Sequence, residues 1–215
     1  MSAGRPAVSP ATSVFINCPF DVEFADQRDA IVFTCVQCGF YPVLADSSGQ
    51  SGRPRLDRIL DALTGCGYSI HDLSRCRGEG DENLARFNMP LELGMAMAVR
   101  RMNGDKAATE PAHEYLILVP EDRLLYQRYV SDLAGLDPQT HDGSVARVVS
   151  EVLAWLLTAG EAPAEVTPDE ILGKLPDFIT AKGQLVASWQ GGTVPWPAVV
   201  ALAAAVAQGH HVGPG

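Results

Sequence analysis

Two acidic residues stand where the sequence allows chemistry on a sugar. Asp72 ends a short apolar segment, and Glu92 opens the string Glu92-Leu-Gly-Met-Ala96. We expect Glu92 in the first turn of a helix, where the helix dipole favours an ionised carboxylate, and the small Gly94 leaves room for a ligand. Such a carboxylate attacks an anomeric carbon, or stabilises the oxocarbenium-like cation that develops there, which is what N-glycosidic cleavage requires. We expect Asp72 in the same cleft, where it would bind ribose hydroxyls.

The same residues also have purely structural interpretations. Glu92 suits the dipole of any helix, and Asp72 suits the turn after a strand. His71 is either a general acid or a strand residue with a satisfied hydrogen bond. Asn88 serves the start of the helix more readily than it touches a substrate.

The remaining candidates follow from strand ends. In an open parallel sheet, the ligand binds beyond the carboxyl ends of the strands. The substrate-binding candidates at those ends are Asn17, Pro19, Phe20, Asp21, Asp46, His71, Ser74, Arg75, Arg86 and Asn88.

Arginine is concentrated near the third of these ends. Half of the 16 basic residues lie between residues 53 and 101. Arg75, Arg77 and Arg86 therefore predict a phosphorylated ligand, because guanidinium groups bind phosphate in paired hydrogen bonds. Alternatively, they form solvated ion pairs with nearby acidic residues of the same loop.

Apolar segments of two kinds alternate along the chain and must position these side chains. Alternation of strands and helices predicts an α/β fold, a three-layer parallel sheet of four to five strands with helices on both faces. Pro42 favours an edge place for its strand. The predicted strands are 13–17, 40–45, 67–71 and 115–120, with a short fifth near 129–133; the predicted helices are 23–38, 55–64, 90–102 and 144–157.

Composition shifts divide the chain. Residues 1–12 and 209–215 are expected to be polar tails, and 13–160 the α/β domain. A linker then leads to a C-terminal helical appendage at 167–208, with helices near 168–188 and 196–207. Thr167 and Glu170 have capping-box spacing at the start of the first of these helices.

Bulk composition excludes several classes of protein. The 215 residues carry a net charge of −10, which makes nucleic acid an improbable partner. No segment is long enough to span a membrane, and no signal segment opens the chain. Five cysteines at irregular spacing indicate reduced thiols in a cytoplasmic protein, and no group of residues has metal-site spacing.

Three segments together carry a resemblance. Val14-Phe-Ile-Asn-Cys-Pro-Phe-Asp21, Ile70-His-Asp-Leu-Ser74 and Glu92-Leu-Gly-Met-Ala96 resemble the nucleoside 2-deoxyribosyltransferase family and the related TIR-like domains of bacterial defence systems. The resemblance covers about residues 13–135. It implies a flavodoxin-like sheet, with Glu92 as the catalytic carboxylate, Asp72 as the acid on the sugar side, and Asn17 and Phe20 lining the pocket.

One departure shapes the functional hypothesis. The transferases commonly have an acidic residue six positions before the catalytic Glu, where this chain has Arg86. We therefore expect an N-glycosidase or glycosyltransferase that cleaves the N-glycosidic bond of a nucleoside, nucleotide or, preferably, NAD, which enters as substrate with no cofactor required. One alternative is a non-catalytic nucleotide-sensing module that signals to a partner protein through the C-terminal helices. Another is a homo-oligomer built through the sheet edge and residues 198–207.

Overall fold

The computed structural model describes residues 9–45, 52–76, 87–104, 113–120, 131, 135–160 and 162–210. Residues 1–8 of the expected tail 1–12, residues 211–215 of the expected tail 209–215, and the candidates Asp46, Arg77 and Arg86 lie outside these ranges. Residues 10–12 of the first tail instead form a short 3-10 helix. The elements are β1 (Ser13–Asn17), η2 (Val22–Phe24), α1 (Ala25–Gln37), β2 (Tyr41–Leu44), α2 (Arg55–Gly65), β3 (Tyr68–Asp72), α3 (Asn88–Gly104), β4 (Glu114–Val119), β5 (Gln139–Thr140), α5 (Val145–Ala159), α6 (Pro168–Ser188) and α7 (Trp196–Ala207), with η1 (Pro10–Thr12) before β1.

The five strands form one parallel sheet in the order β2-β1-β3-β4-β5. This is the flavodoxin-like order of doubly wound folds, so the predicted α/β fold class is confirmed. β2 is an edge strand, as Pro42 indicates. A fifth strand was predicted near 129–133, a stretch in which only residue 131 is among the described residues; β5 of the described sheet lies at Gln139–Thr140. A strand of two polar residues has no hydrophobic pattern by which a sequence would reveal it.

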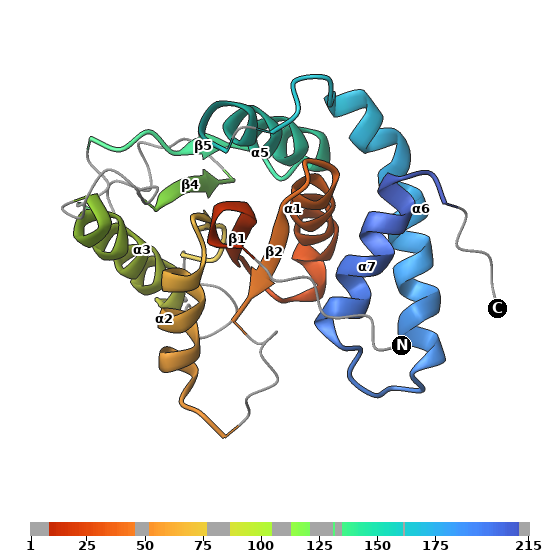
Figure 1. Cartoon of the computed structure of the whole chain (residues 1–215), viewed down its shortest axis with the longest axis horizontal. Helices are drawn as coiled ribbons and strands as arrows, with labels where there is room; N and C mark the ends of the chain where they lie inside the picture. Colours follow the sequence, from red (N-terminus) through yellow and green to blue (C-terminus); the bar gives the residue numbers. More distant parts are fainter. Residues whose placement is uncertain are drawn as a thin grey trace.

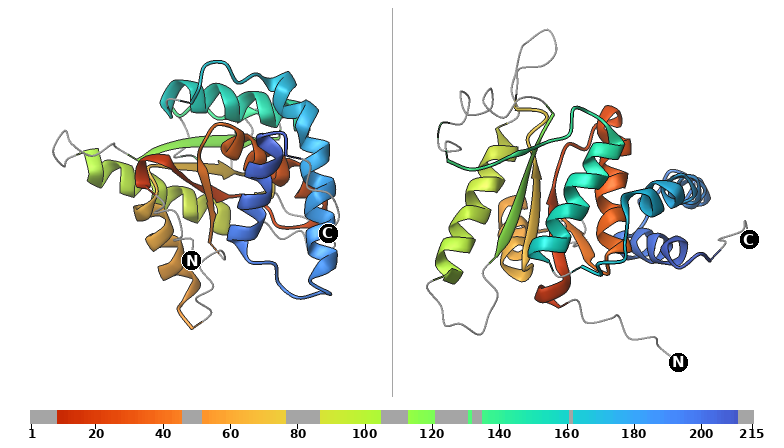
Figure 2. Two further views of the ribbon diagram at one scale, coloured as in Figure 1. Left: turned by 45° about the vertical axis from the view of Figure 1, so that its right-hand side comes forward. Right: turned by 90° about the horizontal axis from the view of Figure 1, so that it is seen from above.

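Helices cover both faces of the sheet (Figures 1 and 2). α2 and α3 pack on one face, and α1 and α5 pack on the other. Side chains alternate along each strand, so Phe15 packs toward α2 and α3 whereas Ile16 and Ile70 join the larger core under α1 and α5. Separate apolar clusters therefore hold the sheet from its two sides.

The start of α3 differs from the prediction. The helix begins at Asn88 rather than at Pro90, and the amide of Leu91 donates to the carbonyl of Phe87. Pro90 is tolerated at the third helical position because the first amides of a helix have no intrahelical partner. Glu92 consequently begins the second turn, where the dipole contributes less to its ionisation than the first-turn prediction assumed.

The C-terminal helices share the core of the α/β domain. α6 begins at the predicted cap, where the Thr167 side chain accepts from the amide of Glu170. Phe178 of α6 stacks on Phe33 of α1 with ring centroids 5.2 Å apart. The indole of Trp196, at the start of α7, donates to the carbonyl of Pro42 at 2.8 Å. α6 and α7 thus form an extra layer on α1, and residues 162–167 do not separate two cores.

Among the helices of the described ranges, none combines the length and apolarity needed to cross a bilayer.

Candidate functional site

The point where the strand order reverses lies between β1 and β3. Asn17 ends β1 and lies opposite His71 of β3 in the ladder. Asn17 and His71 share the face of Phe15, toward α2 and α3, because alternate residues of a strand point the same way. Asp72 shares the face of Ile70, toward α1 and α5. Each face of this switch point therefore has its own polar constellation.

On the α3 face, buried side chains form a chain of hydrogen bonds that we call the Asn17 relay: Asn17, His71, Ser69 and His113. Nδ2 of Asn17 contacts Nδ1 of His71 at 3.1 Å and donates to the Met89 carbonyl at 3.1 Å. Nε2 of His71 is 2.9 Å from the Ser69 hydroxyl, which is 2.8 Å from Nε2 of His113. Nδ1 of His113 ends the chain 2.8 Å from the carbonyl of Cys66.

The two carbonyls at the ends determine every proton in the relay. The Met89 carbonyl only accepts, so the Asn17 atom beside it is the amide nitrogen, and Nδ1 of His71 accepts its second proton. The Cys66 carbonyl likewise requires a proton on Nδ1 of His113. His71 then donates through Nε2 to Ser69, and Ser69 donates to His113. Both imidazoles are neutral in this arrangement.

Burial favours the same neutral state. Desolvation, and then the nearby His113, lower the pKa of His71 to about 3. Desolvation also lowers the pKa of His113, with the Cys66 carbonyl opposing the shift. His71 is therefore a neutral structural histidine in the physiological range, and this disfavours the general-acid interpretation.

Glu92 is buried on the same face of the sheet. Its side chain is 3% exposed, and Oε1 lies 3.0 Å from a guanidinium nitrogen of Arg55, whose side chain is 43% exposed. Asn17 bonds to the carbonyl of Met89, three residues before Glu92 on the same helix. The end of β1 is thereby tied to the helical turn that leads to this carboxylate.

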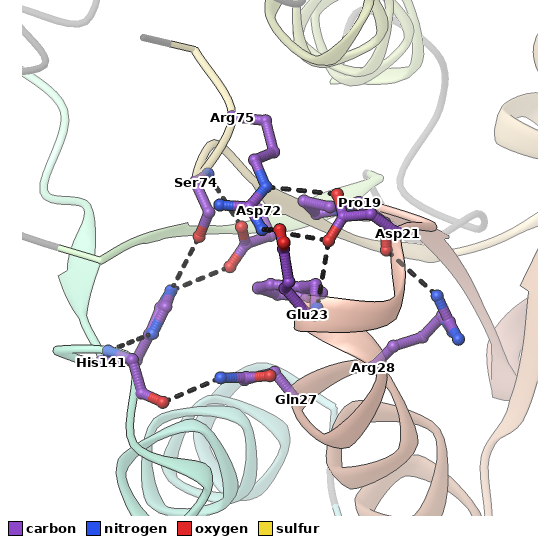
Figure 3. Close-up of polar contacts among 11 residues, drawn as sticks. Pro19, Asp21, Glu23, Gln27, Arg28, Asp72, Ser74, Arg75 and His141 are labelled. Carbon is purple, nitrogen blue, oxygen red and sulfur yellow. Dashed lines mark hydrogen bonds and ion pairs between the residues drawn. The ribbon is translucent and has the colours of Figure 1, made fainter. Parts of the chain in front are cut away.

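On the opposite face, Asp72 contacts the loop after β3 and the loop before α5 (Figure 3). Oδ1 accepts from the backbone amide of Ser74 at 2.8 Å, and Oδ2 lies 3.0 Å from Nε2 of His141. Nδ1 of His141 accepts from the amide of Gly143, so the His141 proton is on Nε2. Asp72 is fully buried and holds the loop after β3 against the loop before α5.

Ser74, His141 and Asp72 do not form a catalytic triad. A triad needs the acid on one ring nitrogen and the nucleophile on the other. The Ser74 hydroxyl and the Asp72 carboxylate both approach Nε2 of His141, at 3.3 and 3.0 Å. The other nitrogen faces a backbone amide. The arrangement is suited to fixing loops.

Arg75 joins the loop after β3 to the loop after β1. Its guanidinium donates twice to Asp21, at 3.2 and 3.0 Å, and once to Glu23 at 3.0 Å. Asp21 also caps η2 by accepting from the amide of Phe24. The charge of Arg75 is thus met within the chain, so the predicted phosphate contact would have to compete with two carboxylates.

The neighbouring residues of the β1 loop are held by Arg28. This arginine donates to the carbonyl of the buried Pro19 and lies over the Phe20 ring, 5.4 Å from its centroid. Phe20 is half exposed. The thiol of Cys18, beneath them, is buried, and desolvation followed by the charge of Asp72 raises its pKa well above the usual range. Cys18 is therefore unreactive despite its place in the loop.

The candidates fall into groups that the sequence did not separate. Asn17 and His71 meet at the relay, whereas Asp21, Asp72, Ser74 and Arg75 meet on the other face. Among the described residues, no hydrogen bond or ion pair joins Asp72 to Glu92. Asn88 is the first residue of α3 and is partly exposed.

Four participants were not predicted from the sequence: Arg55, Ser69, His113 and His141. His141 directly follows β5, a strand that the sequence did not reveal. His113 lies beside the start of β4, at the edge away from the expected ligand. Arg55 belonged to the arginine-rich segment but was assigned only to its helix, since an ion pair 37 residues apart has no local signal.

No family model, curated protein or solved structure matched this chain when it was compared with each.

Proposed function

We propose that the chain binds a nucleoside, nucleotide or NAD at the β1/β3 switch point and cleaves its N-glycosidic bond with Glu92. One observation carries the proposal. The carboxylate of Glu92 lies on the α3 face of the sheet beside that switch point, and this residue is only 2% exposed. Ligands of doubly wound sheets bind at this position. A carboxylate shielded from water also interacts more strongly with a developing positive charge.

The step needs the carboxylate, the substrate and water. As the bond from the anomeric carbon to the base breaks, its electron pair leaves with the base: nicotinamide leaves NAD as a neutral molecule, whereas the base of a nucleoside takes up a proton from water. Oε of Glu92 bonds to that carbon or stabilises the cation until water or a second base adds. Arg55 lies 3.0 Å from Glu92, and its exposed position allows it to meet a substrate phosphate in turn.

Asp72 has a different role in this proposal from the one expected. Its oxygens already face the Ser74 amide and His141, and its side chain lies on the other face. We assign Asp72 to holding the loops that border the site. The acid on the sugar side would then have to come from another residue.

Glu92→Gln tests the role of the carboxylate. We expect at least a thousand-fold loss of turnover, because the amide keeps the shape and removes the charge. Stability should fall by about 1 kcal/mol, since Arg55 is solvated. The measurement is chromatography of released base after incubation with NAD and with the four common deoxynucleosides.

Glu114→Gln is the matched control, because Glu114 pairs with Arg100 at 2.8 Å at the amino end of β4. It breaks a Glu–Arg pair far from the proposed chemistry and should leave turnover unchanged. Wild-type turnover in Glu92→Gln, or an equal loss in both variants, would contradict the proposal.

A nucleotide-sensing module is the second candidate, favoured by one contact. The Arg55 ion pair balances the charge of Glu92, which suits a binding residue better than a nucleophile. This function predicts a raised melting temperature with NAD or a nucleoside and no released base over hours. Measuring both quantities on the same samples separates the two functions.

A further inference from the structure

The orientation of the Asn17 amide restricts what this residue offers to a ligand. Both of its N–H groups are used within the chain, one toward His71 and one toward the Met89 carbonyl. No described residue donates a hydrogen bond to Oδ1. The group that remains is therefore an acceptor, at the end of β1 and at the switch point.

The relay prevents the amide from reversing. A flipped amide would place Oδ1 against the Met89 carbonyl, which only accepts. It would also require a donor on Nδ1 of His71. His71 could supply one only by gaining a proton or by giving up its bond to Ser69. Gaining a proton would bury a charge, and giving up the bond would leave Ser69, which is committed to His113, without its donor; both alternatives are unfavourable inside the protein.

We infer that Asn17 is a specificity-determining residue that selects ligands bringing a hydrogen-bond donor, a sugar hydroxyl or an amino group, to the end of β1, and that His71, Ser69 and His113 are positioning residues that maintain this selection. The inference rests on the proposed binding of a nucleoside at the switch point. It adds that the site rejects ligands with only an acceptor or an apolar edge at that position.

The test compares adenosine with two analogues that each lack a donor. Purine riboside lacks the amino group, and 2′,3′-dideoxyadenosine lacks two sugar hydroxyls. Titration calorimetry would measure their dissociation constants with the full chain carrying Glu92→Gln, which prevents turnover. With Asn17 intact, we expect the analogue that lacks the contacted donor to bind about ten-fold more weakly than adenosine. In Asn17→Leu this difference should disappear.

Ser69→Ala is the second variant and keeps the test valid if Asn17→Leu does not fold. It removes the acceptor for His71 and frees the Asn17 amide to turn. The dissociation constants of adenosine and of the analogue that lacks the contacted donor should then become nearly equal. If the relay had a purely structural role, Ser69→Ala would weaken the binding of both ligands by the same factor, and the ratio of their dissociation constants would stay as in the protein with Ser69.

Nitrogen-15 NMR of the histidines checks the relay itself. A proton on Nε2 of His71 and on Nδ1 of His113 is expected, and the opposite tautomers would overturn the inference. Equal discrimination with and without Asn17 would overturn it as well, while released base in the wild-type assay would leave the proposed function standing. If adenosine did not bind, the inference about Asn17 would also be overturned. The proposed function is tested separately, by turnover of NAD or deoxynucleosides.

Discussion

At the scale of single residues, the central feature is how burial decides which polar groups are free to act. Asn17, Ser69, His71 and His113 are nearly inaccessible to solvent, yet each has a hydrogen-bond partner. Protonating or removing one member of such a network would disturb its buried neighbours. The relay is consequently intolerant of an added proton, and this has a measurable effect on stability.

We predict that the free energy of unfolding falls as the pH is lowered from 7 to 5. The pKa of His71 is about 3 in the folded chain and about 6.5 when unfolded. Below pH 6.5 the unfolded chain therefore binds a proton that the folded chain excludes, which removes about 2 kcal/mol between pH 7 and pH 5. Above pH 6.5 this contribution is constant. Urea denaturation at several pH values measures the effect.

His71→Gln is the control for this prediction, because it removes the titrating group. The decline between pH 7 and pH 5 should be smaller than in the wild type, whatever the absolute stability of the variant. Equal slopes for the two proteins would show that His71 is not the source.

At the scale of elements, the polar contacts join helices and loops that are far apart in the sequence. The loops after β1 and β3 are held together by Arg75, and the loop before α5 is attached through His141. α6 is attached to α1 by Lys182, whose ammonium donates to both carboxylate oxygens of Asp29. Asp29 is 6% exposed, so this ion pair is largely removed from water.

We predict that Lys182→Met destabilises the chain by about 3 kcal/mol, because the buried Asp29 carboxylate loses its counter-ion. Arg147→Met is the matched control, since Arg147 is 55% exposed and lies 3.5 Å from Glu151. Its loss should cost less than about 1 kcal/mol. Chemical denaturation of both variants gives the comparison.

Neutralising the acid tests the reason for that effect. Combining Asp29→Asn with Lys182→Met removes the uncompensated charge, and the double variant should be more stable than Lys182→Met alone. A double variant less stable than the single one would mean that the packing of the lysine stem, rather than its charge, accounts for the loss.

At the scale of the whole molecule, one continuous core runs from the sheet through α1 to α6 and α7. The buried residues Ile16, Ile70, Phe178 and Ala203 belong to the same cluster, although they come from four different elements. Helices that share a core with a sheet are not free to unfold alone at low cost. We therefore expect cooperative behaviour across the predicted domain boundary.

We predict a single unfolding transition for residues 13–207. Fluorescence of Trp196, in a variant with Trp155 and Trp189 replaced by Phe, reports on α7, and far-UV circular dichroism reports on all helices. The two curves should coincide. Phe178→Ala should lower the free energy of unfolding obtained from each curve by the same amount, about 3–5 kcal/mol, because it opens a cavity against Phe33. A fluorescence change at lower denaturant than the dichroism change would contradict the shared core.

Local patterns were sufficient for much of the fold. Apolar runs and helical periodicity located β1 to β4 and the helices to within a few residues, and Pro42 identified an edge strand. Thr167 and Ser144 precede α6 and α5 as side-chain caps. These features depend on neighbours in the sequence, which is why they are visible without coordinates. β5 was missed because two polar residues carry no pattern, and α3 was begun too late because Pro90 was taken as its first residue.

The amino-acid sequence by itself determined the fold class and the set of polar residues at the strand ends. Only the tertiary structure decided how those residues are divided. Asn17 and His71 lie on one side and Asp72 on the other because a strand turns alternate side chains to opposite faces, so adjacent residues 71 and 72 belong to different environments. The partners of Glu92 and Asp72, namely Arg55 and His141, are distant in the chain, and only packing brings such charges within reach of each other.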